Sequence, residues 1–381
     1  MKIGINLLWW RWGKMGGVEA YTKNLLYGFS ELNEEFGIEL YVNPEVEEKL
    51  KKEINFDNRF KFVTLNVNPH NIKKVFVYQF TRFHRFLKNR DINVYFLPTP
   101  IYPLRKSKVP SVVTIHDLQF LHYPEYTSFI RRKKYYISCK YCLKNSTKVV
   151  AISNFVKNDI LKHFNVDPDK IEVIYNPIRV SKKLLPFDEL SKKYGIKQKE
   201  YFYTISSLLP HKNTMILLDI FAHDDFKKLN VPKKLVITGV GKPQDQKKVI
   251  ERARQLKIED NIILTGFISD QEKDTLLANA YAFLFPSLFE GFGMPPVEAM
   301  ILGIPVVTTK QPAIYETTQG KALYVDNPYN VKAWMSKIAK LKSLEADLFK
   351  NWKHLSETYS PIKIATKYYQ LFEKVASLQT K

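Results

Sequence analysis

The sequence predicts an α/β protein with two domains, each built on a doubly wound parallel sheet. Short apolar runs alternate with stretches of helical spacing over most of the 381 residues, which is typical of βαβ units. Some of these runs lead through a glycine loop into a helical stretch, the usual opening of a doubly wound sheet. The length suits two domains of ordinary size, and a hydrophobic content of 45% suffices for two cores.

The first half opens with an apolar strand over residues 2–8, a Gly16-Gly17 loop and a helix over residues 20–30. A pair of glycines is a weak signal, because a tight turn alone would explain it. The segments that follow are expected to be strands at 37–42, 60–65, 94–97, 111–115 and 149–154, with helices around 75–88 and 129–144.

The second half repeats the pattern with a strand over residues 201–205 and a helix over 214–221. Ser269 is expected to cap the helix over 270–280. Further strands are expected at 234–242 and 261–269, each running into a glycine loop, and at 280–285 and 304–308; a loop with Glu316 and helices from about 331 onward complete the chain.

The chain is strongly basic, with 59 Lys and Arg against 38 Asp and Glu and a formal net charge of +21. Such an excess favours polyanions, which include nucleic acid, anionic lipid and phosphorylated substrates. The lysines are spread along the chain without a basic arm or tail, so we do not expect a nucleic-acid partner.

The helix over 129–144 concentrates this charge, since it carries cations interleaved with aromatic residues. Two interpretations stay open here: a solvated helix face, or contact with anionic lipid headgroups. We expect no signal peptide and no membrane-spanning segment. Cys139 and Cys142 are expected to be reduced thiols one turn apart rather than half of a zinc site or a redox motif.

The most informative stretch runs from Phe285 to Met300, where a buried strand leads into a glycine loop and a helix that begins with two prolines. A strand end, a glycine loop and a helix N-terminus together form an anion site for a phosphate. Glu290 and Glu298 flank this site. Carboxylates repel phosphate, so we expect both to bind hydroxyl groups of a ribose or another sugar.

Glu290 and Glu298, with the flanking PS, EGFG and EAM, resemble the E-x7-E motif of the GT-B retaining glycosyltransferases of family 4. The resemblance covers almost the whole chain and is strongest over 201–330. It implies two Rossmann-like βαβ domains that face each other across a cleft with the active site. The acceptor-side domain is expected to comprise 1–178 and a returning helix at 361–381, and the nucleotide-sugar domain 179–360.

The resemblance also assigns roles around the donor. Lys212 would grip the diphosphate with help from Ser207, Glu298 would bind the ribose and Glu290 the donor sugar. Two residues depart from the family pattern: Ser206 stands where Gly is common and His211 where Arg is common. The expected donor-binding residues are Gly17, Ser207, His211, Lys212, Gly266, Phe267, Glu290, Gly291, Phe292, Gly293, Met294 and Glu298.

His116-Asp117 follows the strand at 111–115, and the segment from His116 to Tyr126 resembles the HD-L-x-F-x-x-x-P-x-x-Y region of mannosyltransferase-like members. The resemblance makes His116 an active-site residue, and Asp117 is expected to orient its imidazole. The expected catalytic residues are thus His116, Lys212 and Glu290; the acceptor side is expected to involve Gly16, Gly17 and Asp117. His122 is expected to be structural.

The resulting expectation is a retaining, metal-independent hexosyltransferase without a cofactor. GDP-mannose is the preferred donor, with dTDP-rhamnose and UDP-sugars as alternatives, and the expected acceptor is a lipid-linked glycan at the cytoplasmic face of a membrane. Asp167-Pro168-Asp169 resembles a D-x-D metal motif, but a polar turn explains it better. An epimerase or phosphorylase on the same fold, and a non-catalytic accessory subunit, are the other classes considered.

Overall fold

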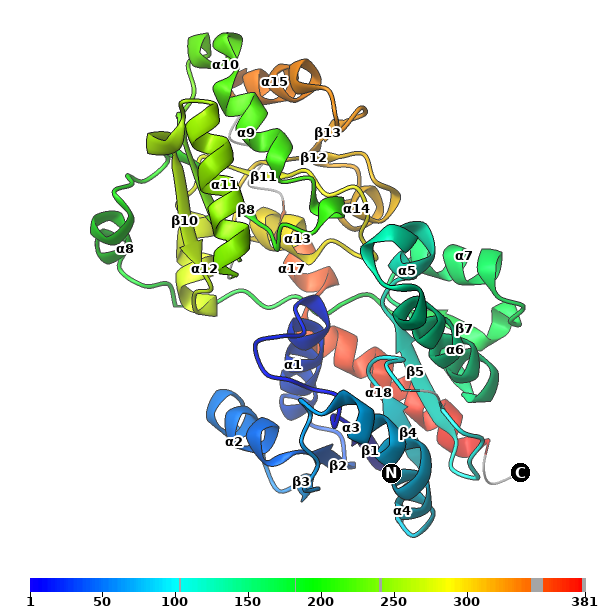
Figure 1. Cartoon of the computed structure of the whole chain (residues 1–381). Helices are drawn as coiled ribbons and strands as arrows, with labels where there is room; N and C mark the ends of the chain where they lie inside the picture. The colour runs from blue at the N-terminus through cyan, green and yellow to red at the C-terminus, as the bar shows by residue number, and fades with distance from the viewer. Residues whose placement is uncertain (103, 182, 240–241, 344–351, 379–381) are drawn as a thin grey trace. The chain divides into compact units, whose positions relative to one another are not determined.

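Figure 1 shows the computed structural model of the chain, coloured from blue at the N-terminus to red at the C-terminus. The structure describes residues 1–102, 104–181, 183–239, 242–343 and 352–378. The chain divides into two compact units, one of Met1–Ile178 with Thr358–Lys381 and one of Arg179–Glu357. Each unit is built on its own parallel sheet, which confirms the predicted α/β class.

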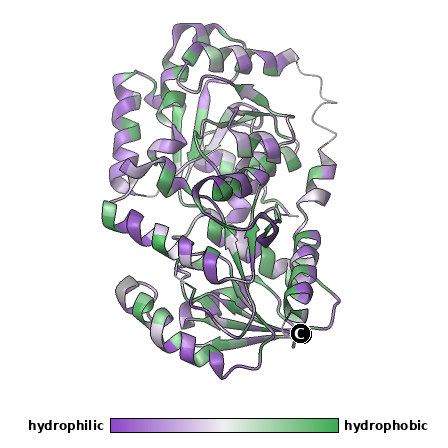
Figure 2. Cartoon of the chain, turned by 90° about the vertical axis from the view of Figure 1, so that its right-hand side faces the viewer, coloured by the Kyte–Doolittle hydropathy of each residue, from purple (hydrophilic) through white to green (hydrophobic). Residues whose placement is uncertain are grey.

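The sheet of unit 1 has seven strands in the order β3-β2-β1-β4-β5-β6-β7, and neighbouring strands pair in parallel. Figure 2 shows its strands largely in the hydrophobic colour, as expected for a sheet that helices cover on both faces. The strands are β1 (Lys2–Asn6), β2 (Gly37–Val42), β3 (Phe60–Thr64), β4 (Val94–Leu97), β5 (Ser111–Ile115), β6 (Lys148–Ala151) and β7 (Ile171–Val173).

The helices of unit 1 connect these strands, and most carry hydrophobic and hydrophilic residues together (Figure 2). Asn43 and Ser153 cap α2 and α7 with side-chain oxygens. The helices are α1 (Gly17–Ser30), α2 (Pro44–Glu53), α3 (Ile72–Tyr78), α4 (His84–Lys88), α5 (Gln119–His122), α6 (Phe129–Asn145), α7 (Asn154–His163) and α18 (Pro361–Ser377), with a π-helical turn at Gln79–Phe83 and 3₁₀ turns at Pro124–Tyr126 and Pro168–Lys170.

The last helix, α18, packs against α1 and joins the core of unit 1. The Tyr21 hydroxyl on α1 lies 2.6 Å from the Tyr368 hydroxyl on α18, and Thr114 Oγ1 on β5 lies 3.0 Å from the same Tyr368 oxygen. All three side chains are buried. Gly28 lets the two helices approach closely, because a Cβ there would lie 2.2 Å from the Pro361 carbonyl oxygen.

The sheet of unit 2 has six strands in the order β10-β9-β8-β11-β12-β13, again paired in parallel. The strands are β8 (Tyr201–Ile205), β9 (Lys234–Thr238), β10 (Ile262–Gly266), β11 (Ala282–Phe285), β12 (Val306–Thr309) and β13 (Leu323–Val325). Its helices are α8 (Phe187–Tyr194), α9 (Met215–Ala222), α10 (Asp224–Lys228), α11 (Pro243–Gln255), α12 (Asp270–Ala278), α13 (Met294–Ile301), α14 (Pro312–Thr317), α15 (Val331–Lys340) and α17 (Lys353–Thr358), with 3₁₀ turns at Pro210–Lys212, Glu259–Asn261 and Leu341–Ser343.

Both sheets reverse their strand order at one point. In unit 1 this point lies between β1 and β4, and in unit 2 between β8 and β11. Ligands of doubly wound sheets bind beyond the carboxyl ends of the strands at such a reversal. In unit 2 the segments that leave these ends carry Lys212 and Glu290.

The structure differs from the sequence-based prediction in several local elements. The strand expected over 149–154 ends at Ala151, because Ser153 already caps α7. Glu316 lies on the short helix α14 rather than in a loop, since Gln311 caps that helix and Pro312 opens it. The glycine loop expected after β9 falls partly outside the described residues, at 240–241.

The C-x-x-C pair is confirmed as two free thiols on α6. Both side chains are buried, and Cys142 Sγ donates to the Tyr102 carbonyl at 3.3 Å. Burial raises the pKa of Cys142 to about 12 and holds the pKa of Cys139 well above its usual value. The two thiols are therefore protonated packing groups.

Candidate functional site

Two loops lie together beyond the carboxyl ends of β8 and β11. The loop after β8 ends in the 3₁₀ turn at Pro210–Lys212, and the loop after β11 runs from Pro286 to the start of α13. The Leu288 amide donates to the His211 carbonyl at 2.7 Å, and the Ser287 hydroxyl donates to the same oxygen at 3.4 Å. These bonds fix the two loops against each other.

Lys212 and Glu290 form an ion pair across the two loops. Lys212 Nζ lies 2.6 Å from Glu290 Oε1, and the side chains are 22% and 15% exposed. Gln311 supports the backbone of this loop, because its Nε2 donates to the Glu290 carbonyl at 3.2 Å. A cation and a carboxylate thus face each other where the strand order reverses.

The N-terminus of α13 provides backbone amides beside this pair. Gly293 caps the helix with φ +81°, a conformation that side chains rarely adopt. Pro295 and Pro296 follow in the first turn and have no N–H, so the donors of this helix end are the amides of Gly293 and Met294. The Phe292 and Met294 side chains are buried, so these residues offer only their backbone to a ligand.

Glu298 lies one turn further along α13 and is paired with a lysine that the sequence analysis did not single out. Lys273 Nζ on α12 lies 2.8 Å from Glu298 Oε2 and 3.2 Å from Asp274 Oδ1. Burial raises the pKa of Glu298. Burial also disfavours the Lys273 ammonium, but the carboxylates of Glu298 and Asp274 outweigh it and raise the pKa of Lys273. The three side chains form a buried charged cluster.

His211 differs from the basic residue that the resemblance implied. It is 4% exposed, and burial, followed by the neighbouring charge of Lys212, lowers its pKa to about 4. The imidazole is therefore neutral near neutral pH and offers no positive charge to a phosphate. Lys212 remains as the cation of this turn, Ser206 is bonded to the Thr214 hydroxyl, and Ser207 is exposed.

At the end of β10, Gly266 adopts φ +69° and accepts a hydrogen bond from the Gly239 amide at 2.9 Å. Phe267 follows with 74% of its surface exposed. Phe267 was expected to bind the donor, and an aromatic ring with so much free surface is available to stack on a nucleotide base.

In unit 1, His116 stands directly after β5. Its Nε2 lies 2.7 Å from the Pro98 carbonyl oxygen, and its ring packs edge-on against Tyr21 with 4.7 Å between centroids. Burial lowers the pKa of His116 to about 4. A carbonyl can only accept, so Nε2 carries the proton of the neutral ring and Nδ1 is an acceptor. The orienting contact expected of Asp117 thus comes from Pro98, while Asp117 Oδ1 accepts from the Gln119 amide at 3.0 Å.

Gly16 and Gly17 form the other candidate turn of unit 1. Gly16 caps α1 with φ +55°, and a Cβ on either glycine would meet no atom within 4 Å. Open space of this kind would let a ligand approach the backbone. Glu19, which the sequence analysis passed over, shapes this loop by accepting from the amides of Gly13 at 2.8 Å and Met15 at 3.2 Å.

Two family models match this chain, one over each half. The model described as Glycosyltransferase Family 4 matches residues 15–182, and the model described as Glycosyl transferases group 1 matches residues 186–357. The chain belongs to glycosyltransferase family 4. The resemblance drawn from the E-x7-E motif is thereby confirmed.

Curated relatives of this family 4 chain include two with names from O-antigen synthesis. The O-antigen chain mannosyltransferase RfbU of Salmonella typhimurium is 32% identical over 232 residues, and the match spans 61% of each chain. The O-antigen chain mannosyltransferase B of Escherichia coli is 27% identical over 275 residues, or 70% of this chain and 69% of the relative.

Solved structures with the same fold are also found. The crystal structure of Anabaena HepE in complex with UDP-glucose aligns with a TM-score of 0.73 at 18% identity, over 98% of this chain and 100% of HepE. At this identity the likeness concerns the fold alone, and together with the family it confirms the predicted GT-B fold.

The family resemblance led to the two glutamates and to Lys212, but not to Lys273. Lys273 follows the capping box of Ser269 and Glu272 and has the acidic neighbours Asp270 and Asp274, so its sequence context is that of a solvated helix turn. The contact with Glu298 joins residues 25 positions apart and depends on how α12 packs beside α13. The predicted residues fall into two sets: His116, Asp117, Gly16 and Gly17 in unit 1, and the donor-side residues in unit 2.

Proposed function

We propose that this family 4 protein transfers a hexose from a nucleotide-diphosphate sugar to a growing cell-surface glycan, with retention of anomeric configuration. The Lys212–Glu290 pair carries the proposal, because it sets a phosphate-binding cation against a sugar-binding carboxylate at the reversal of the unit 2 sheet. The amides of Gly293 and Met294 add donors for the diphosphate.

The charge that needs stabilising develops on the departing diphosphate. In the proposed step the acceptor hydroxyl oxygen bonds to the sugar C1, the C1–O bond to the phosphate breaks, and the hydroxyl proton passes to the departing phosphate oxygen. Lys212 stabilises that oxygen electrostatically, so the step needs neither a metal ion nor a protein nucleophile. His116 is our proposed active-site residue of unit 1, because its neutral ring, held by Pro98, can offer Nδ1 to a sugar hydroxyl.

Asp167 and Asp169 form the D-x-D arrangement that was considered for a metal, and we assign them to a polar turn. Asp167 Oδ1 accepts from the Asp169 amide at 2.9 Å and thereby closes a 3₁₀ turn before β7. This contact supports assigning the pair to local structure.

GDP-mannose is our preferred donor, because two relatives are named as mannosyltransferases and the segment from His116 resembles the mannosyltransferase-like members. dTDP-rhamnose and UDP-sugars are the alternatives, and the HepE structure was solved with UDP-glucose. We propose a lipid-linked oligosaccharide as acceptor and a peripheral location at the cytoplasmic face of a membrane. Among the described residues, no helix has the length and apolarity to cross a bilayer.

A thermal-shift assay with UDP, GDP, dTDP and ADP tests the donor site. A nucleotide at about 100 times its dissociation constant should stabilise the protein by about 2.7 kcal/mol. We expect one nucleotide to raise the melting temperature, and Lys212→Ala to abolish that rise. Lys227→Ala is the matched control, because it breaks a lysine–carboxylate pair of 2.9 Å on α10, outside the two loops.

Two results would contradict the proposal. If none of the nucleotides stabilises the folded protein at saturation, the non-catalytic accessory subunit becomes the better interpretation. If Lys212→Ala responds to nucleotide as Lys227→Ala does, the donor diphosphate does not bind at the Lys212–Glu290 pair.

A further inference from the structure

An open groove of about 710 Å³ lies between α3 and α6 in unit 1. Its apolar lining comes from Phe76 and Val77 on α3 and from Phe129, Ile130 and Ile137 on α6. Val77 is 59% exposed, Phe129 67%, Ile130 81% and Ile137 41%. Exposed apolar side chains gathered in this way mark a contact surface rather than ordinary scatter. We call this surface the α3–α6 groove.

Cations lie directly beside this apolar lining. Lys133 and Lys134 contribute to the α3–α6 groove, and Lys134 Nζ lies 4.4 Å from the centre of the Phe76 ring. The guanidinium carbon of Arg132 lies 5.5 Å from the centre of the Phe129 ring. The positive charges are thus interleaved with the exposed rings.

The two segments that form the groove contain no acidic residue. The helices α3 (72–78) and α6 (129–145) carry Lys73, Lys74, Arg131, Arg132, Lys133, Lys134, Lys140 and Lys144, and neither includes an Asp or a Glu. The carboxylate that precedes α6 most closely in sequence is Glu125, in the 3₁₀ turn at Pro124–Tyr126.

The solvated face of helix α2 in the same protein differs from α6, because its lysines are paired with glutamates. On α2, Lys51 pairs with Glu47 and Lys52 with Glu48, each four residues apart at 2.6 Å. The cations of α6 have no carboxylate on their own helix, and this excess of positive charge favours an anionic partner over the solvated-face interpretation.

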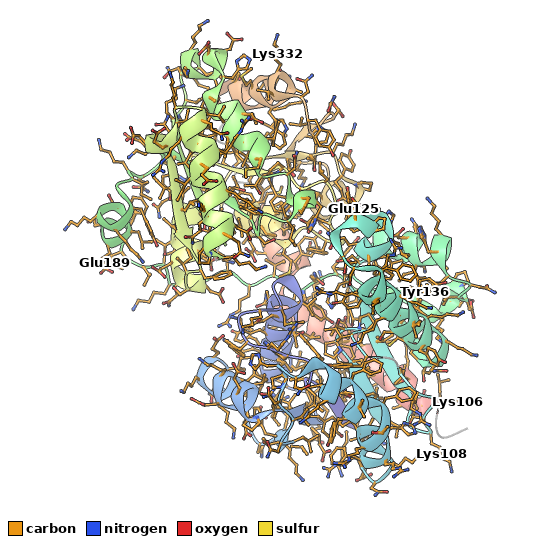
Figure 3. All side chains as sticks on the ribbon, viewed as in Figure 1. Lys106, Lys108, Glu125, Tyr136, Glu189 and Lys332 are labelled. Carbon is orange, nitrogen blue, oxygen red and sulfur yellow. The ribbon has the colours of Figure 1, made fainter. Side chains whose placement is uncertain are left out.

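The exposed apolar face of α6 is distinct from the face that packs on the core of unit 1. Ser138, Cys139, Cys142 and Leu143 pack inward and are buried. Ile137 and Tyr141 lie on the opposite side, where Tyr141 is 46% exposed. Tyr136, labelled on this helix in Figure 3, is 37% exposed and stacks on Phe164 with 5.2 Å between ring centroids. Aromatic rings with a polar tip suit the boundary between water and lipid.

We propose that the α3–α6 groove docks onto an anionic lipid bilayer, with Phe129 and Ile130 inserted at the headgroup level and the surrounding lysines and arginines on phosphate groups. An interfacial helix of this kind combines apolar burial with attraction to anionic lipid. A nucleic acid would use the cations but leave the apolar lining without a partner. The inference deepens the peripheral location proposed above, because it assigns that location to α3 and α6, and it does not depend on the donor.

Co-sedimentation with vesicles tests the docking. The full chain is mixed with vesicles of phosphatidylcholine alone, or with vesicles that also contain about one third phosphatidylglycerol. We expect binding to the anionic vesicles only, and weaker binding at high salt because the charges are screened. Phe129→Ser/Ile130→Ser should weaken binding to anionic vesicles by roughly tenfold or more, since it removes the inserted side chains but no charge.

Matched variants separate docking from general effects. Ile250→Ser/Tyr329→Ser is the control for the apolar side chains, because it removes two exposed side chains from unit 2 and should leave vesicle binding unchanged. Tyr329 matches Phe129 in exposure, since each is 67% exposed. Arg131→Gln/Lys133→Gln should also weaken binding, whereas Lys247→Gln/Lys248→Gln, which removes the same charge from α11, should not.

Three outcomes would overturn the proposal. The first is that the protein does not bind anionic vesicles, and the second is that the groove variants and the control variants lose the same amount of vesicle binding. The third is that Phe129→Ser/Ile130→Ser binds as strongly as the parent protein. That result would indicate a purely electrostatic contact with any polyanion. Melting temperatures of all variants report whether they fold. The nucleotide response of unit 2 is measured in parallel, so a failed donor site and a failed docking surface give different results.

Discussion

Lys273 Nζ lies 2.8 Å from Glu298 Oε2, and this contact joins α12 to the helix that carries the second glutamate of the E-x7-E motif. The side chains of Lys273 and Glu298 are 18% and 8% exposed, and Asp274 beside them is 1% exposed. One cation therefore compensates two buried carboxylates. The ammonium also occupies one of the Glu298 oxygens, so Lys273 would orient this carboxylate in the proposed ribose contact.

Lys273→Met should destabilise the protein by about 3–5 kcal/mol, because it leaves two buried carboxylates without a counter-charge. Lys193→Met is the control: Lys193 Nζ lies 2.8 Å from Glu272, but the lysine side chain is 54% exposed. Breaking that exposed pair should cost far less, because solvent screens its charges. Urea unfolding measures both values, and equal losses would show that the Lys273–Glu298 pair acts as a surface pair.

Glu298→Gln should weaken the binding of a nucleoside diphosphate by about tenfold or more, because a neutral amide replaces a charged acceptor for the ribose hydroxyls. Inorganic pyrophosphate lacks the ribose, so its affinity should change little in the same variant. Isothermal titration of both ligands gives the comparison. An equal loss for both would assign Glu298 to the packing of α13 instead of to ribose binding.

Glu290→Gln should separate binding from turnover. Glu290 neutralises Lys212 at 2.6 Å, so its removal makes the ammonium more available to a diphosphate, and nucleotide affinity should stay the same or increase. The loss of the hydroxyl contact to the donor sugar should nevertheless lower kcat by about a hundredfold. Steady-state kinetics and nucleotide titration measure the two effects. A parallel loss of affinity and turnover would contradict these separate roles.

Acid should weaken the fold through two histidines. Burial lowers the pKa of His116 and of His211 from the ordinary value of 6.5 to about 4. Between these values the unfolded chain binds protons that the folded chain excludes, so this contribution to stability is complete above pH 6.5 and is lost as the pH falls toward 4.

His211→Asn should therefore make the free energy of unfolding less dependent on pH in that window. His70→Asn is the control, since the His70 side chain is 48% exposed. Urea unfolding at about pH 7 and at about pH 4.5 compares the variants with the parent protein. If the three proteins lose the same stability on acidification, His211 is not buried in its neutral form.

The local elements were largely predictable because their signals are local. The strand at 201–205 was predicted at its observed bounds, since a run of aromatic and β-branched residues stands between polar neighbours. The cap of α12 was predicted from Ser269 and is a complete capping box with Glu272. Strand 149–154 was predicted too long, because Ile152 continues the apolar run after Ala151 and only the cap at Ser153 ends the strand.

The electrostatics of the candidate site could not be predicted in this way. Lys212 and Glu290 were both named, but their ion pair joins residues 78 positions apart and depends on the strand order. His211 was expected to bind the donor although it stands where Arg is common, and only the fold reveals the burial that makes its ring neutral. Lys273 has the sequence context of an exposed lysine, and tertiary packing alone brings it to Glu298.

Gly28→Ala should destabilise unit 1 by about 1–3 kcal/mol, although alanine favours a helix more than glycine does. A Cβ at Gly28 would lie 2.2 Å from the Pro361 carbonyl oxygen, and a backbone atom cannot move aside unless α1 and α18 separate. Gly17→Ala is the control, because its Cβ would meet no atom within 4 Å. Thermal unfolding compares the variants; a stabilised Gly28→Ala would show that helix propensity outweighs the contact and that α18 packs less closely on α1.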